Sequence, residues 1–177
     1  MDELIEDLRN EFQRYKLLIE KALAQVPDES LNRVVAPGCN SIAMIVRHLN
    51  GNLTSRLSEF LTTDGEKVWR DRDTEFVERS YARDELEELW RKAWLVVDQT
   101  LGSLTDADMQ KKVTIRQEEW PVHGALCRLS AHLSYHAGQI VLLSRMFCEK
   151  DWHWLSVPKG KSKEYMSRPA QDRKPKA

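Results

Sequence analysis

One long helix is predicted over Trp120 to Phe147, WPVHGALCRLSAHLSYHAGQIVLLSRMF, and this stretch constrains the fold more than any other. Pro121 suits the start of such a helix, where a missing N–H group costs little. His132 and His136 stand four residues apart, so they lie one turn apart on the same face. Further residues fall close to that face: Ala125, Leu129, Gln139 and Leu143. Because the face is largely apolar, we expect both histidines to point into the protein.

Two imidazoles one helical turn apart can share a metal ion. The stretch lacks the glutamate of the HExxH motif, because Leu133 follows His132. The alternative is a pair of core histidines that donate to backbone carbonyls. A third ligand would favour the metal, and the remaining histidines are His48, His123 and His153.

His48 lies on a second predicted helix, which starts at Asn40 or Ser41 and runs to about Thr62. The apolar stripe of this helix continues through His48: Met44, Ile45, Leu49 and Leu53. A single histidine on such a stripe is more often a hydrogen-bonded core residue, but His132 and His136 lie on an equivalent face. Asn52 and Ser55 follow one turn later, close to the direction of His48.

Two more amphipathic helices are predicted, over residues 2–25 and from Arg83 to Leu101, where Gly102 ends the second. Residues 62–76 are expected to form a loop over one end of the bundle, anchored by Trp69 and Phe76. A single turn over 105–109 and a short extended piece over 112–116 complete the pattern.

The size and charge of the chain limit its class. Its 177 residues suffice for one domain, and its 27 basic and 28 acidic residues nearly cancel. This balance gives no attraction to nucleic acid or to an anionic membrane surface. No apolar run approaches the roughly 20 residues that span a bilayer. The acidic, amphipathic N-terminal segment is wrong for a signal peptide, so we expect a cytoplasmic protein.

Two further predictions concern the cysteines and the C-terminal segment. Cys127 and Cys148 fall on the helix side opposite His132, and only Cys39, in the loop before His48, is less certain as a ligand. The segment DWHWLSVPKG, residues 151–160, is expected to fold back on the bundle. We therefore predict one domain over 1–161, followed by a polar, basic and flexible tail over 162–177.

Three stretches carry a family resemblance: SIAMIVRHLNGNLTSRLSEFLTTDGEKVWRDRDTEF, SAHLSYHAGQIVLLSRM and DWHWLSVPKGKS. With them the chain resembles the DinB/YfiT-like superfamily of metalloenzymes, and within it the DUF1572 group. The resemblance implies an all-α four-helix bundle with one long crossover loop and a C-terminal extension, and often a homodimer. It also implies one divalent ion, zinc or nickel, bound by His48, His132 and His136.

Relatives in the superfamily transfer small molecules onto thiols such as bacillithiol, or isomerise mycothiol adducts. The resemblance therefore implies a metal-dependent enzyme acting on a small molecule, most simply a thiol S-transferase with a low-molecular-weight thiol as cosubstrate. A hydrolase and a non-catalytic metal-binding stress or sensor bundle are the alternatives. Asn52, Ser55 and Gln139 are candidates to contact the ligand histidines or the substrate, or are simply core hydrogen-bonding residues. No catalytic residue can be named.

Overall fold

The structure is a computed structural model that describes residues 3–148 and 152–169. Its long helices are α1 (Glu3–Leu23), α2 (Ile42–Leu57), α3 (Arg83–Ser103) and α4 (Val122–Phe147). The shorter elements are the 3-10 turns η1 (Asp28–Ser30), η2 (Asp73–Phe76) and η3 (Asp106–Asp108), the strands β1 (Lys112–Ile115) and β2 (Glu118–Pro121), and helix α5 (Ser162–Met166). The predicted all-α four-helix bundle is confirmed.

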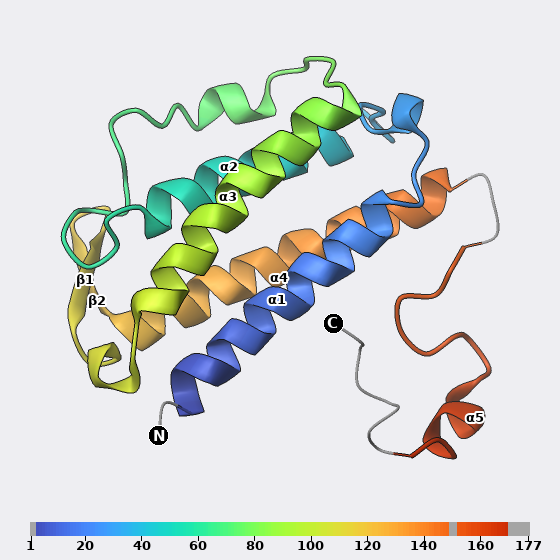
Figure 1. Cartoon of the computed structure of the whole chain (residues 1–177). Helices are drawn as coiled ribbons and strands as arrows, with labels where there is room; N and C mark the ends of the chain where they lie inside the picture. The colour runs from blue at the N-terminus through green and yellow to red at the C-terminus, as the bar shows by residue number, and fades with distance from the viewer. Residues whose placement is uncertain (1–2, 149–151, 170–177) are drawn as a thin grey trace.

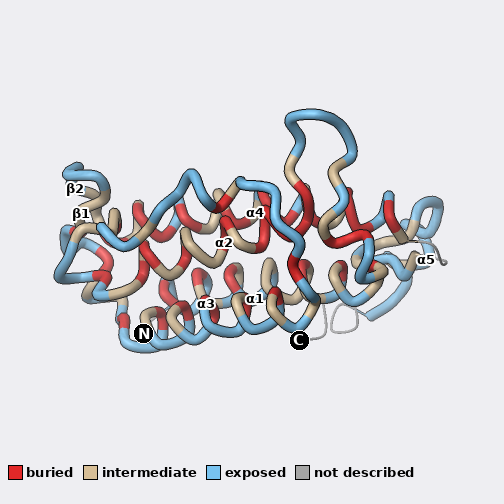
Figure 2. Tube along the Cα trace, turned by 90° about the horizontal axis from the view of Figure 1, so that it is seen from above, coloured by how far each residue is buried: buried red, intermediate tan, exposed pale blue. Residues whose placement is uncertain are grey.

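The helices pack in two layers. Figure 1 shows α1 beside α4 and α2 beside α3. In the view from above, α2 and α4 form one layer, α1 and α3 form the other, and buried residues lie between them (Figure 2). Because α2 and α3 run in the same direction, residues 58–82 must return along the bundle (Figure 1). This return is the predicted crossover connection.

The apolar faces of the helices build the core. Its largest fully buried side chains are Trp94, Phe12, Ile5, Ile19, Leu31, Ile42, Ile45, Leu49, Leu53, Leu57, Leu104 and Leu126. Ser41 caps α2, because its hydroxyl accepts from the backbone N–H of Met44 at 3.2 Å. Asp106, which is distant in sequence, caps α1: its carboxylate accepts from the backbone N–H of Ile5 at 2.9 Å. Local capping and tertiary contacts thus fix the helix ends together.

The two strands form an antiparallel hairpin at one end of the bundle (Figure 1). Its turn places Arg116 and Gln117 at φ 54° and 65°, a conformation that is costly for residues other than glycine. Asp64 offsets this cost: its carboxylate accepts from the backbone N–H of Arg116 at 2.9 Å and of Gln117 at 2.8 Å. The N–H of Glu66 donates to the same carboxylate at 2.7 Å, so one side chain joins the crossover connection to the hairpin.

The predicted helix boundary next to the hairpin was wrong. The last long helix begins at Val122, because Trp120 and Pro121 pair with Val113 and Lys112 as strand β2. Pro121 precedes the helix with an extended ψ of 147°.

Three further details differ from the prediction. Helix α2 ends at Leu57, because Ser58 is extended and Glu59 has φ 50°. Helix α3 continues through Gly102 to Ser103. Trp69 does not anchor the crossover, since its side chain is 58% exposed.

The segment after α4 lies against the bundle, as expected. Trp152 and Leu155 are partly buried against the core, whereas α5 has no buried residue. Within the described residues, no helix combines the length and apolar character that crossing a bilayer requires.

Candidate metal centre

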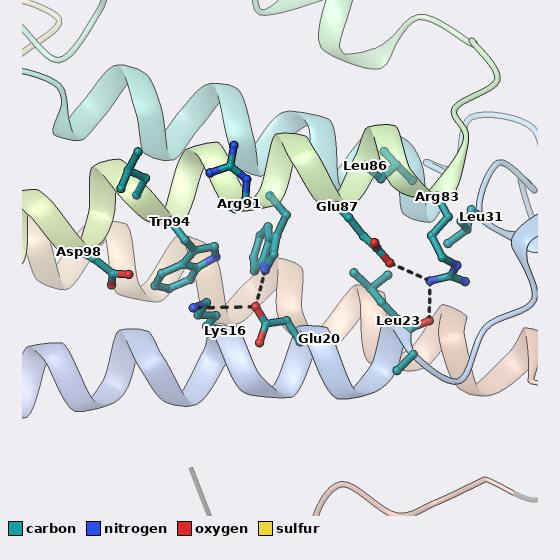
Figure 3. Close-up of a pocket in the computed structure, with 13 residues that line it drawn as sticks. Lys16, Glu20, Leu23, Leu31, Arg83, Leu86, Glu87, Arg91, Trp94 and Asp98 are labelled. Carbon is teal, nitrogen blue, oxygen red and sulfur yellow. Dashed lines mark hydrogen bonds and ion pairs between the residues drawn. The ribbon is translucent and has the colours of Figure 1, made fainter.

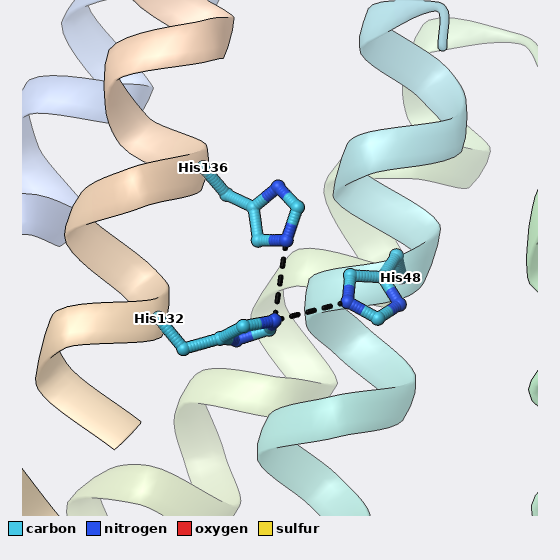
Figure 4. A group of neighbouring side chains, drawn as sticks. All are labelled: His48, His132 and His136. Carbon is cyan, nitrogen blue, oxygen red and sulfur yellow. Dashed lines mark hydrogen bonds between the residues drawn. The ribbon is translucent and has the colours of Figure 1, made fainter. Parts of the chain in front are cut away.

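Three histidines from two helices meet inside the bundle. His48 projects from α2, and His132 and His136 project toward it from successive turns of α4 (Figure 4). Each offers a ring nitrogen, and these three atoms lie within 4.8 Å of one another. His48 and His136 are buried, and His132 is partly exposed. The structure thus brings together the three histidines that the sequence singled out.

The tautomer of His48 is set by a carboxylate. Its Nδ1 lies 2.8 Å from Oε2 of Glu75, and a carboxylate can only accept. His48 must therefore carry its proton on Nδ1, which leaves a lone pair on Nε2. That Nε2 atom points at Nε2 of His132, 3.1 Å away.

His136 is oriented in the same manner by Gln139. Its Nδ1 lies 2.7 Å from Oε1 of Gln139, and the amide nitrogen of Gln139 donates to the hydroxyl of Tyr135 at 3.1 Å. The amide oxygen is thus the acceptor, His136 is protonated on Nδ1, and its Nε2 also carries a lone pair. This second Nε2 lies 3.2 Å from Nε2 of His132.

His132 stands between two lone pairs and can satisfy only one of them. A proton on its Nε2 can be donated to His48 or to His136, and its Nδ1 has no partner among the described residues. A divalent cation satisfies all three nitrogens at once. Nitrogens bound tetrahedrally to one zinc ion at about 2.0–2.1 Å lie roughly 3.3 Å apart, close to the two separations of 3.1 and 3.2 Å that involve His132. The cluster is therefore compatible with metal binding.

The ring charges agree with this arrangement. Burial lowers the pKa of His132 to about 3, and repulsion from His136, His48 and nearby arginines adds to the effect. Burial also lowers the pKa of His136 to about 4, against the raising effect of its hydrogen bond to Gln139. Both imidazoles are neutral near pH 7, which is the form that binds metals.

Sequence reasoning missed Glu75, which belongs to a buried ion-pair network. Arg70 binds both of its carboxylate oxygens, at 2.8 and 3.0 Å, and also donates to the hydroxyl of Ser55 at 3.0 Å. Burial alone would raise the pKa of Glu75, but the hydrogen bonds from His48 and Arg70 hold it below its usual value. Ionised Glu75 therefore orients His48.

The fit of Glu75 depends on a glycine. A Cβ atom at Gly51 would lie 2.1 Å from Oε1 of Glu75, so α2 can accept the carboxylate only where it has no side chain. The available sequence signal was the charged run around Arg70 and Glu75, together with the rule that a ligand histidine donates to a carboxylate. Nothing local distinguished Glu75 from the neighbouring acidic residues.

The histidines are reached from a cavity of about 350 Å³. Its lining residues are His48, Asn52, Arg56, Phe60, Arg70, Arg72, Ile115, Arg116, Ala125, Arg128, Leu129 and His132. Asn52, one of the predicted contact residues, lines this space and its buried Oδ1 has no partner among the described residues. Ser55 and Gln139 instead contact Arg70 and His136, as described above.

A larger cavity, of about 480 Å³, lies between α1 and α3 (Figure 3). Trp90 and Trp94 form its floor with aliphatic neighbours, and Glu20 accepts from the indole N–H of Trp90 at 3.0 Å. None of the described histidines or cysteines lines it. We therefore place the candidate site at the smaller cavity.

The other histidines and the cysteines lie outside the cluster. His123 is engaged at Nδ1 with the carbonyl of Met109 at 2.9 Å, and His153 is exposed on the segment after α4. Cys39 and Cys127 are exposed free thiols, and Cys148 is partly buried. None of them joins the group of potential metal ligands found in the described part of the chain.

The fold and the cluster define a class: a DinB-like helical bundle with three inward histidines on two of its helices. A crystal structure of a DinB-like protein from Bacillus cereus ATCC 10987 superposes with a TM-score of 0.58. The alignment covers 80% of this chain and 91% of that protein at 20% identity, so it shows the fold. A search of curated proteins gave no match. The model of the DUF1572 family, described as a protein of unknown function, matches residues 1–161, and the chain belongs to that family.

Proposed function

We propose that the protein is a metal-dependent enzyme acting on a small molecule, with one zinc or nickel ion held by His48, His132 and His136. The observation that carries this proposal is the cavity of about 350 Å³, which His48 and His132 line. A structural metal site is closed by protein ligands, whereas a catalytic one keeps a position open to substrate. Three histidine ligands beside a cavity match the catalytic pattern.

A divalent ion bound by three neutral imidazoles would supply positive charge that lowers the pKa of a bound water or thiol. The remaining work falls to the chain itself. Glu75 and Gln139 fix the tautomers of His48 and His136. Arg70, whose side chain is 2% exposed, holds Glu75 in place. Phe76 packs on the ring of His48, with centroids 4.9 Å apart, and shields it from water.

Thiol transfer is favoured over hydrolysis by the residues around the cavity. Within the part of the chain that the structure describes, no carboxylate lines the cavity to act as a general base toward water. Glu75 is bound to His48 and Arg70, and the position after His132 is the buried Leu133. A thiol needs less assistance, because its usual pKa of about 8.5 is near neutrality.

The test is a conjugation assay with zinc- or nickel-loaded protein, a panel of low-molecular-weight thiols and alkylating electrophiles. We expect turnover in the native protein, loss in His132→Ala, and no change in the control His153→Ala, which removes an exposed histidine. Hydrolysis of esters or amides that is lost in His132→Ala, without conjugation, would replace thiol transfer by hydrolysis. Stoichiometric metal without any turnover would favour the non-catalytic bundle.

We also propose a homodimer in the cytoplasm. Support comes from the family resemblance and from α4, where Tyr135, Leu142 and Met146 are each about 60% exposed, at 63%, 60% and 59%. These side chains recur at helical spacing, so they form an apolar stripe that a second copy can cover. Light scattering at micromolar concentration is expected to give twice the 20.7 kDa of one chain. A monomer mass would contradict the dimer.

A further inference from the structure

The cavity beside the histidines is rich in arginine. Five guanidinium groups line it, and they come from α2, the crossover connection, the hairpin and α4: Arg56, Arg70, Arg72, Arg116 and Arg128. Among the described residues, no aspartate or glutamate lines the same space. Residues from two distant parts of the chain, 56–72 and 116–128, thus bring positive charge to one small volume.

Nearby carboxylates neutralise only part of this charge. Glu75 is occupied by Arg70, and the single carboxylate of Glu66 is shared between Arg56 at 3.1 Å and Arg116 at 2.6 Å. Asp64, close to Arg56, is already bound to three backbone N–H groups. Arg56 also keeps a buried Nη1 atom without a partner in the described part of the chain.

Two of the arginines have no carboxylate partner among the described residues. Arg72 lies over the ring of Phe76 at 5.3 Å, and Arg128 lies over the ring of Trp120 at 5.0 Å. Each ring face holds its guanidinium in place without neutralising it. Both groups are therefore positioned, charged and available to bind an anion through paired N–H donors.

The remaining lining limits the kind of anion. Phe60, Ile115, Ala125 and Leu129 give the cavity an apolar portion. Its volume of about 350 Å³ lies near the lower end of the range for ligand pockets. An inorganic anion would leave the apolar part unused, whereas a compact organic molecule would fill both parts.

We propose that this cavity binds a small organic anion with at least two negative charges, whose carboxylate or phosphate groups pair with Arg72, Arg128 and the free edge of Arg56. As a statement about substrate class, it rests on the proposed function. As a statement about binding, it rests on the arginines alone, so it can be tested without metal or turnover.

The test uses calorimetry on metal-free protein with three probes: phthalate, phenylphosphonate and dimethyl phthalate. Dimethyl phthalate keeps the ring and the four oxygen atoms of phthalate but has no charge, because both carboxylates are methyl esters. We expect both dianions to bind and the neutral ester not to bind. Tighter binding of phenylphosphonate would indicate a phosphate-bearing ligand, and tighter binding of phthalate a carboxylate-bearing one.

The variants Arg72→Gln and Arg128→Gln should each weaken dianion binding about tenfold, since a lost charge-assisted contact is worth roughly that factor. Arg128→Lys should keep part of the affinity, because it retains the charge. The matched control is Arg91→Gln, which removes an arginine of the α1–α3 cavity that is paired with Glu88 at 2.8 Å. Circular dichroism checks that each variant is folded.

Equal binding of phthalate and its dimethyl ester would overturn the proposal, and so would native affinity in both glutamine variants. Arginine-dependent binding of dianions by a protein that shows neither conjugation nor hydrolysis would uphold the anion site and refute the proposed function. Conjugation that proceeds equally in the native protein and in the Arg72→Gln, Arg128→Gln double variant would uphold the proposed function and refute the anion site.

Discussion

The two cavities differ less in size than in how their polar groups are satisfied. In the cavity between α1 and α3 each charged lining residue has a partner: Lys16 and Glu20, Arg83 and Glu87, Arg91 with Glu88, and Asp98 with Gln13. In the histidine cavity, lone pairs converge on one point, and two arginines have no carboxylate partner among the described residues. The polar groups of the larger cavity are thus paired with one another, whereas those of the smaller cavity are in part unpaired within the described chain. Unsatisfied groups, more than volume, identify the site.

The largest effect on the difference between the two cavities is expected from removing one of the three clustered histidines, which are the proposed metal ligands. His132→Ala should abolish stoichiometric zinc binding, because two remaining imidazoles cannot hold the ion against buffer. Elemental analysis of untagged protein measures this, and circular dichroism should show the helices intact. His153→Ala, an exposed histidine, is expected to keep full metal content. Equal loss in both variants would show that the cluster does not bind the metal.

A smaller effect is expected from Glu75→Gln. The amide can still accept from His48, but it loses the charge that polarises the ring and balances buried Arg70. Removing such a hydrogen-bonded carboxylate typically lowers metal affinity about 10–100-fold. Zinc titration against a competing chelator measures the change. Glu88→Gln, which affects an exposed carboxylate on α3, is the control and should have native affinity.

Gly51→Ala tests the role of the Glu75 carboxylate by a substitution on α2, against which that carboxylate packs. The added methyl would lie 2.1 Å from Oε1 of Glu75, so the carboxylate must move away from His48. We expect metal affinity to fall by about the lower part of the range for Glu75→Gln, near tenfold. Gly138→Ala on α4 is the matched control, because its methyl would meet nothing within 4 Å. Native affinity in both variants would contradict a role for Glu75.

The histidines of the smaller cavity should also make the stability of the protein depend on pH. His132 and His136 have pKa values of about 3 and about 4 in the folded protein, below the ordinary 6.5. The unfolded chain thus binds more protons below pH 6.5, and the free energy of unfolding of metal-free protein should fall from there toward about pH 4. Thermal melts across this window measure the fall. The variant His132→Ala should show a shallower dependence on pH.

The smallest effect is expected outside both cavities. Truncation after Lys161 should leave the melting temperature nearly unchanged, since α5 has no buried residue. The flexible tail and the domain boundary at 161 remain predictions, and residues 170–177 lie outside the described part of the chain. A fall of many degrees would show that the tail docks on the bundle.

The three clustered histidines could be predicted because they lie on helices, where a repeat of about 3.6 residues fixes which side chains share a face. His48, His132 and His136 all follow apolar stripes, and the family resemblance assigned the three as a set. Glu75 and Arg70 lie in the connection over 58–82, which has no such repeat. Their burial depends on Gly51 and His48, residues distant in sequence, so no local pattern could distinguish them from solvent-exposed charges.

The turn and the second strand of the hairpin were missed for a related reason, whereas β1 matches the extended piece predicted over 112–116. The turn residues, Arg116 and Gln117, are not the asparagine and glycine that usually mark such turns. The conformation is tolerated because Asp64 binds both backbone N–H groups. A residue fifty positions away in the chain therefore supplies what the local sequence lacks.

The hydrogen bonds that the hairpin turn donates to Asp64 also have a consequence for redesign of the protein. Arg70, Arg72 and Arg116, at the cavity, belong to connections, whereas the histidines belong to helices. The preference of the cavity for one bound molecule over another can thus be altered by exchanging the connections, while the three proposed metal-binding histidines keep their helices. The connection over 58–82 and the hairpin over 112–121 must be exchanged as one cassette, because Asp64 of the first sets the turn of the second.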